Sequence, residues 1–180
     1  VGALAPAGAQ GISDAAGLYF CSGNEQYLVL NLEEWASMRQ TFYHETAHAI
    51  DCYINGTAYQ SFQSGEWESL NPEGFSYAYS YAEDQEALNG SWVAGLSLSE
   101  PAYFVDTYSK TFPAEDRARI LEYAMAFGDL PVYFQERPIQ QKLSYLCSRI
   151  REAFDTAGWP EKTLWEAPLK ENLKDFEKTN

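Results

Sequence analysis

The feature that most constrains this chain is the segment His44-Glu45-Thr46-Ala47-His48, which contains its only two histidines. On a helix, residues four apart share one face and lie about 6 Å apart along the axis. The imidazoles of His44 and His48 can then each place a nitrogen about 2.0–2.1 Å from one Zn²⁺ ion. Glu45 follows the first histidine, where its carboxylate can reach a water beside the metal rather than the metal itself. Coincidence on an ordinary helix is the alternative, and the spacing favours a zinc site.

The composition limits the classes of protein to which this chain can belong. With 180 residues, 46% hydrophobic and 16% aromatic, the chain is long and apolar enough for one globular domain with a core of its own. Its net charge of −14 argues against binding to nucleic acid or to an anionic membrane surface, because both need basic patches. No apolar run approaches the roughly 18 residues of a membrane span.

The two ends of the chain suggest its organisation. Residues 1–11, rich in Ala and Gly, are expected to form a flexible linker, and residues 12–180 a single domain. Because the first residue is Val, the amino terminus is interpreted as a processed or trimmed end, which favours a secreted or surface-anchored protein of a bacterium. The cysteines permit one disulfide and one thiol, or three buried thiols; they are Cys21, Cys52 and Cys147.

The segments around the histidines predict a hairpin followed by a helix. Residues 17–21 and 26–30 are short β-type runs separated by a turn. Asn31 offers an N-cap, with Glu34 completing a capping box, so a helix is predicted from Leu32 to Ile54, ending at Asn55-Gly56. Its core stripe is predicted to be Trp35, Met38, Phe42 and Ala49.

The rest of the chain divides into a loop-rich stretch and two more helices. Residues 57–106 lack a helical period and predict short strands and long loops that form a functional surface. A second helix is predicted to open at Thr111 and Pro113 and to close at Gly128. A third should run from Pro138 to before Gly158, and the charged tail beyond residue 161 should be anchored by aromatic and aliphatic side chains. The buried face of the third helix is predicted as Ile139, Leu143, Leu146, Ile150 and Phe154, and the tail anchors as Trp165 and Leu169.

A catalytic zinc site needs a third protein ligand besides the two histidines, with one position left open. The metzincin pattern is excluded, because Asp51 and Ile54 hold the places of its Gly and third His. A carboxylate on a rigid element is then expected, which favours Glu115 or Asp116 without deciding between them. The full set of candidates is Glu66, Glu68, Glu73, Glu83, Glu86, Glu100, Glu115 and Asp116.

Other residues near the motif have more than one interpretation. Asp51, one turn beyond His48, could hydrogen-bond a ligand histidine or lie solvated on the helix surface. Cys52 is expected to be a buried structural thiol. Trp67 and Phe75 could line a cleft, but core packing is expected for both.

Two parts of the chain together resemble a known family. The segment His44–Asp51, followed by Tyr108-x6-Glu115-x2-Ala118, is similar to the gluzincin peptidases typified by the anthrax lethal-factor catalytic domain, and to bacterial zinc-binding metallopeptidases. The resemblance covers about 80 residues. It implies that Glu115 is the third metal ligand and that Tyr108 contacts the reacting carbonyl oxygen. The chain departs from the family at Arg119, where the lethal-factor type has a second Glu.

The expected protein is therefore an α+β, zincin-like domain, mostly helical with a small sheet beside the motif helix. The resemblance implies a zinc metallopeptidase that hydrolyses peptide or protein substrates, with Zn²⁺ on His44, His48 and Glu115, Glu45 as general base and Tyr108 donating to the oxyanion. The alternative is an inactive zincin-like binding or surface protein that keeps its zinc. The intact Glu45 argues against that alternative, because a protein without turnover has no chemical need of the base.

Overall fold

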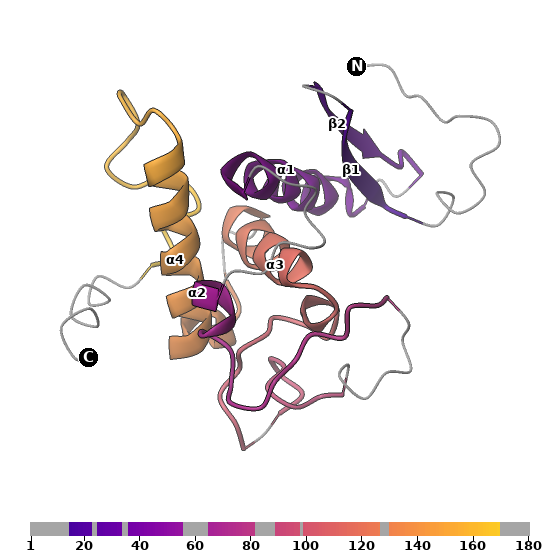
Figure 1. Cartoon of the computed structure of the whole chain (residues 1–180), viewed down its shortest axis with the longest axis vertical. Helices are drawn as coiled ribbons and strands as arrows, with labels where there is room; N and C mark the ends of the chain where they lie inside the picture. Colours follow the sequence, from indigo (N-terminus) through magenta and orange to yellow (C-terminus); the bar gives the residue numbers. More distant parts are fainter. Residues whose placement is uncertain are drawn as a thin grey trace.

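Two neighbouring helices, α1 (Met38–Asn55) and α3 (Pro113–Ala126), organise the computed structural model, which describes residues 15–22, 25–33, 36–55, 65–81, 89–97, 99–126 and 130–169. α3 packs against α1 on one side and against α4 (Arg137–Ala153) on another, and a two-stranded sheet packs against α1 (Figure 1). The fold is thus mostly helical with one small antiparallel sheet. The shorter elements are α2 (Gly65–Glu68) and the 3₁₀ helices η3 (Tyr108–Lys110) and η4 (Val132–Gln135).

The sheet is the predicted hairpin of β1 (Gly17–Ser22) and β2 (Glu25–Leu30), and its presence is confirmed. The strands pair antiparallel, with Phe20 opposite Tyr27. Of the predicted turn Ser22-Gly23-Asn24, Ser22 is the last residue of β1 and pairs with Glu25, while Gly23 and Asn24 lie outside the described residues. Because side chains alternate along a strand, Tyr19 points the other way from Phe20, and it is buried. The side of β1 that carries Tyr19 therefore belongs to the core beside α1.

The start of α1 differs from the prediction. The helix begins at Met38, not at Leu32, although its end at Asn55 agrees with the predicted stop. The reason is local: Asn31 Oδ1 accepts a hydrogen bond from the backbone N–H of Glu33 at 3.0 Å, which forms an Asx turn instead of capping a helix. Glu34 and Trp35 lie outside the described residues.

The buried face of α1 also differs from the prediction. Phe42 is 47% exposed, whereas polar residues are buried on the other side of the helix. The predicted core stripe assumed that apolar residues face inward, but this helix turns its polar motif toward α3. Its buried residues are Thr41, Glu45, Ala47, His48, Asp51 and Cys52.

The hydrophobic core lies mainly between α3 and α4. The predicted face of α4 is confirmed, since four of its five members are buried and Phe154 packs against the same core cluster. The tail anchors Trp165 and Leu169 also pack against this cluster. Two small residues, Ala47 of α1 and Ala118 of α3, belong to it and are almost completely buried, which permits a close approach of these two helices.

The described residues between α1 and η3 contain little regular structure. They form α2 and an isolated bridge between Val93 and Phe104, but no strand, so the predicted short strands are wrong for this part. Trp67 is buried and Phe75 packs against the core cluster, which confirms core packing for both. Burying aromatic side chains from a loop-rich segment fixes its path without a ladder of hydrogen bonds.

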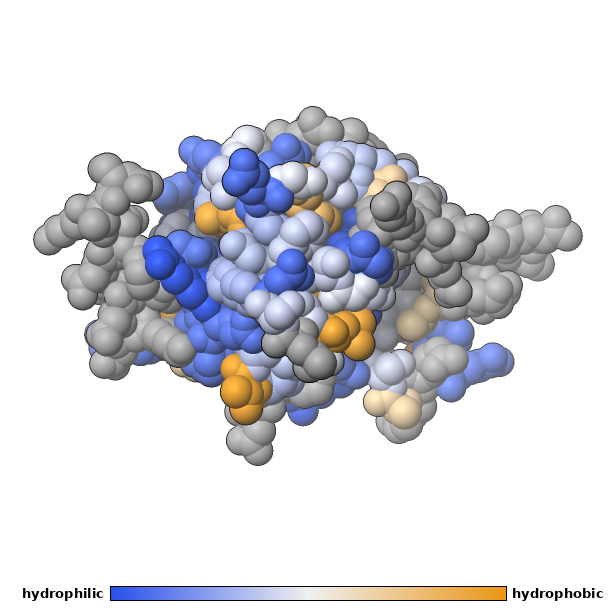
Figure 2. Space-filling view, turned by 90° about the horizontal axis from the view of Figure 1, so that it is seen from below, coloured by the Kyte–Doolittle hydropathy of each residue, from blue (hydrophilic) through white to orange (hydrophobic). Residues whose placement is uncertain are grey.

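One face of the molecule shows how its described hydrophobic residues are distributed. From below, hydrophobic residues appear as separate small patches among polar ones (Figure 2). Among the described helices, none is both long and apolar enough to cross a membrane. Cys52 and Cys147 are buried, as expected for Cys52; the side chain of Cys21 lies outside the described part.

Candidate metal centre

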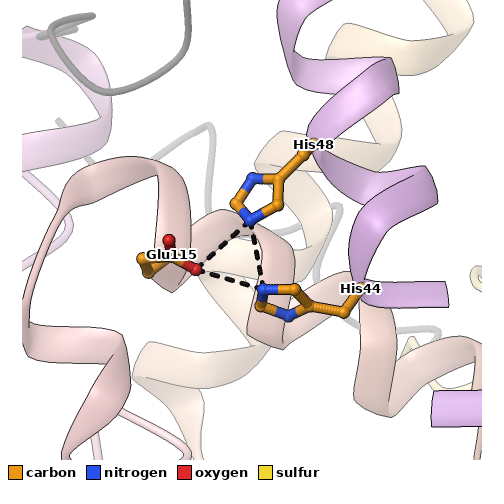
Figure 3. A group of neighbouring side chains, drawn as sticks. All are labelled: His44, His48 and Glu115. Atoms are coloured by element: carbon orange, nitrogen blue, oxygen red, sulfur yellow. Dashed lines mark hydrogen bonds and ion pairs between the residues drawn. The ribbon is translucent and has the colours of Figure 1, made fainter. Parts of the chain in front are cut away.

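The two histidines of α1 and one glutamate of α3 point at a common position. His44 and His48 lie one helical turn apart on the side of α1 that faces α3, and Glu115 lies in the first turn of α3 (Figure 3). His44 Nε2 is 3.1 Å from His48 Nε2 and 3.1 Å from Glu115 Oε2, and His48 Nε2 is 3.2 Å from the same oxygen. The structure therefore brings together three donor atoms from residues that are up to 71 positions apart.

These three donors form a group that could hold a metal ion. Ligands bound at about 2.1 Å in a tetrahedron lie about 3.4 Å from one another, so the observed triangle is close to the size of one coordination shell. Two imidazole nitrogens and one carboxylate oxygen are a donor set that suits Zn²⁺. His48 and Glu115 are buried, whereas His44 keeps a small exposed fraction.

The charges at the triangle are coupled to one another. Burial lowers the pKa of His44, but hydrogen bonds and charges of Glu115 and Glu122 outweigh that effect and raise the pKa to about 9. Burial raises the pKa of Glu115, yet its contacts with His44 and His48 hold the pKa well below its usual value. In the metal-free protein a proton on His44 thus supplies the positive charge that a metal ion would otherwise bring.

Glu122 orients the ring of His44. Its Oε2 lies 3.0 Å from His44 Nδ1, so an Nδ1–H donating to this carboxylate leaves Nε2 as the lone-pair donor of the triangle. Burial raises the pKa of Glu122, but its contacts with His44 and Arg119 bring the pKa below its usual value. Glu122 was not among the sequence candidates, although it follows Glu115 by seven residues and so shares its face of α3.

Arg119 contacts the same oxygen of Glu122 that lies against His44. Its Nη1 donates to Glu122 Oε2 at 2.8 Å, and its Nε lies 2.9 Å from Asp106 Oδ2. The chain of contacts Asp106–Arg119–Glu122–His44 therefore ends at a donor of the triangle. Arg119, where the chain departs from the family that it resembles, thus holds the carboxylate of Glu122 in place beside His44.

Glu45 follows His44 on α1 and lies against β1 of the hairpin. It is buried and accepts a hydrogen bond from the backbone N–H of Tyr19 in β1. Burial raises the pKa of Glu45, while the neighbouring His44 and His48 oppose this change. Gly17 makes the approach possible, because a Cβ at this position would lie 2.8 Å from Glu45 Oε1. The carboxylate is thus held beside the triangle without belonging to it.

Two tyrosines border the triangle on the side of Glu115. The ring of Tyr108, in η3, lies 6.3 Å from the ring of His44. The guanidinium of Arg119 lies 5.3 Å from the centroid of the Tyr108 ring. Burial and the charge of Glu115 raise the pKa of the Tyr108 hydroxyl, so it stays protonated and can donate a hydrogen bond. Tyr81 donates to Glu115 Oε1 at 2.8 Å, which leaves Oε2 for the triangle. Tyr81 stands in a loop, where no sequence signal indicated it.

The other carboxylates that the sequence singled out lie elsewhere. Asp116, in the first turn of α3, is completely buried and its Oδ2 lies 2.7 Å from Lys142 Nζ, so it is not part of the donor group. Asp51 does not face the histidines; it accepts two hydrogen bonds from Arg117, at 2.7 and 2.8 Å. The described remaining candidates, Glu66, Glu68, Glu73 and Glu100, are not part of the group, and Glu83 and Glu86 lie outside the described residues.

Comparisons with known proteins add no name to this site. No family model, no curated protein and no solved structure matches the chain. The function therefore has to be inferred from the residues of the site itself.

Proposed function

We propose that this chain is a zinc-dependent hydrolase of peptide bonds. The observation that carries the proposal is the position of Glu45, a buried carboxylate held beside the His44–His48–Glu115 triangle without belonging to it. Three protein donors leave one position of a tetrahedral zinc ion open, as in catalytic rather than structural sites. Zinc bound there would lower the pKa of a water towards 7 and polarise a substrate carbonyl.

The residues of the chain have distinct roles in this proposal. Glu45 accepts a proton from the attacking water and later delivers it to the leaving amine. Burial raises the pKa of Glu45 above its usual value, which favours its taking up a proton from water. The protonated hydroxyl of Tyr108 donates a hydrogen bond to the oxygen on which negative charge develops.

Peptides are the proposed substrates because of the resemblance to the gluzincin peptidases. The sequence left open which of two adjacent carboxylates is the third ligand. Glu115 faces the histidines and Asp116 faces Lys142, and this geometry supports Glu115, the residue that the resemblance implies. A zincin-like fold is part of the same proposal, and the helix pair with a sheet beside α1 supports it.

The test compares the zinc-loaded wild type with Glu45→Gln on a chemically unfolded protein. New amino termini should appear with the wild type, and their rate of appearance should fall by about 10³-fold or more in the variant, because the proton acceptor is lost. The variant should still bind zinc, since Glu45 is not a donor of the triangle.

Glu152→Gln is the matched control, because Glu152 is an exposed glutamate of α4 that pairs with Arg149. It should hydrolyse like the wild type. Hydrolysis that persists in Glu45→Gln would contradict the role of this residue. Zinc binding without any hydrolysis by the wild type would instead support an inactive binding protein.

A further inference from the structure

A run of aromatic rings begins at the metal centre and continues outward along the surface. We call it the aromatic shelf, and it consists of Tyr79, Tyr81, Tyr108 and Phe112. Tyr108 and Tyr81 stack with centroids 5.9 Å apart, Tyr81 lies 4.6 Å from Phe112, and Phe112 lies 6.1 Å from Tyr79. The three tyrosines are between 37% and 44% exposed, so their rings cover one another only in part.

The inner end of the shelf is tied to the donor triangle. Tyr81 donates its hydroxyl hydrogen to Glu115 Oε1, and the ring of Tyr108 lies 6.3 Å from that of His44. An extended peptide advances about 3.3–3.6 Å per residue. A peptide whose carbonyl lies at the triangle can therefore place the side chain of one of its next few residues on the shelf.

The outer end of the shelf is held in a strained backbone conformation. Tyr79 has φ = 52°, a left-handed value that is costly for a bulky residue. Two backbone hydrogen bonds maintain it, from Tyr79 N to Thr111 O at 2.8 Å and from Ala78 N to Lys110 O at 3.0 Å. Such strain persists where the surrounding structure imposes it, and it is concentrated at sites that bind ligands. Here its result is an exposed ring beside Phe112.

Resting on the proposed function, we infer that the aromatic shelf binds an aromatic side chain of the substrate, close to the bond that is cleaved. Rings at centroid distances of 4.5–7 Å attract one another beyond their buried area, and the exposed faces of the shelf offer such partners. A basic side chain fits poorly, because the guanidinium of Arg119 already lies over Tyr108 and a bound metal ion adds further positive charge. An acidic side chain would gain nothing from the electron-rich ring faces.

The experiment uses the zinc-loaded protein and sets of peptides that differ at a single position, which carries Phe, Ala or Lys. For the wild type, one position within three residues of the cleaved bond should show a preference for Phe over Ala of roughly tenfold to a hundredfold in kcat/KM. Lys at this position should be no better than Ala. Hydrolysis that shows no preference for Phe at any position would overturn the shelf while leaving the peptidase proposal intact.

Binding to the zinc-loaded Glu45→Gln variant, measured by fluorescence anisotropy, separates the two proposals. A preference for the Phe peptide in binding supports the shelf even if the wild type hydrolyses nothing. Absence of both hydrolysis and selective binding overturns the shelf together with the proposed function. Better binding of the Lys peptide would assign the shelf to a cation instead and would also overturn the inference.

The variant Tyr79→Gly tests whether the exposed ring of Tyr79 takes part in substrate binding. Glycine adopts the left-handed conformation without cost, so the variant should unfold at the same or a higher temperature while its Phe-to-Ala ratio falls by about tenfold. The matched control is Tyr53→Ser, which removes an exposed tyrosine of α1 that stacks on Phe154 outside the shelf, and it should keep the wild-type ratio. A destabilised Tyr79→Gly protein with an unchanged ratio would mean that the ring is structural.

Discussion

His44 uses both of its ring nitrogens. Nε2 belongs to the donor triangle, while Nδ1 contacts Glu122, whose second partner is Arg119. A carboxylate behind a ligand histidine fixes its tautomer and makes its free nitrogen a stronger donor. The quality of the site thus depends on residues that do not touch the metal position.

Glu122→Gln should weaken zinc binding by about 10- to 100-fold, because the amide has no charge and accepts the Nδ1–H less strongly. The measurement is competition with a chelator of known affinity. Glu152→Gln serves again as the control and should bind zinc like the wild type. Equal affinities of Glu122→Gln and the wild type would show that the contact with His44 has no influence on the metal.

Zinc affinity should rise with pH. Burial lowers the pKa of His44, but the adjacent carboxylates raise it from 6.5 to about 9. Zinc must therefore displace a proton from His44 at neutral pH. The proton stabilises the metal-free fold fully below pH 6.5, and this contribution is lost as pH rises to about 9. The apparent affinity should therefore increase by up to about tenfold per pH unit in this range.

Calorimetry in two buffers of different ionisation enthalpy measures this proton directly. About one proton should leave the protein for each zinc bound at pH 7. An affinity that does not change between pH 6.5 and 9 would mean that His44 is already neutral in the metal-free protein.

At the same scale, the sequence indicated the residues that form the triangle but not those that support it. His44, Glu45 and His48 follow from one short spacing, and Glu115 follows from the family resemblance. Glu122 and Tyr81 become visible only when α3 and the loop are in place, because their contacts join residues 78 and 34 positions apart. Asp51 was misread because its partner Arg117 stands on the opposite helix.

At the scale of elements, one face of α3 contributes to the donor triangle and another face packs into the core. Adjacent helical residues are rotated by about 100°, so Glu115 faces the histidines while Asp116 faces α4. Asp116 is buried together with Lys142 and also accepts a hydrogen bond from Tyr77 at 2.8 Å. The same turn of helix therefore serves the metal centre and the core.

Asp116→Ala should destabilise the protein by about 3–5 kcal/mol, because it leaves the charge of Lys142 buried and unpaired. The measurement is denaturant unfolding. The double variant Asp116→Ala, Lys142→Met should recover much of the loss, because it removes both charges and keeps an apolar side chain in the core. A loss below about 1 kcal/mol in the single variant would contradict the burial of this pair.

The elements themselves were largely predictable where local signals agree with the fold. α3 and α4 were found from their caps and periodic apolar residues, and the hairpin from two runs of β-type residues. α1 was placed six residues too early because Asn31 forms a turn of its own. Its buried face was misjudged because a helix that carries a polar site buries polar side chains.

At the scale of the whole molecule, the long stretch between α1 and η3 borders the site at which α1 and α3 meet directly. Its described part includes α2 and the bridge between Val93 and Phe104, and it supplies Tyr81 and Tyr79 to the edge of the site. The sequence predicted a functional surface here, but not its form, because loops are shaped by long-range packing rather than by local periodicity. Trp67 and Phe104, both buried, show this packing.

The most direct test of the account is the zinc content of the purified protein, measured by elemental analysis after dialysis against metal-free buffer. The wild type, reconstituted with zinc, should retain about one Zn²⁺ per chain. The double variant His44→Ala, His48→Ala should retain none, and Glu115→Ala should lose its zinc to a competing chelator far more readily than the wild type. Stoichiometric zinc in the double variant, or none in the reconstituted wild type, would contradict the assignment of the metal centre.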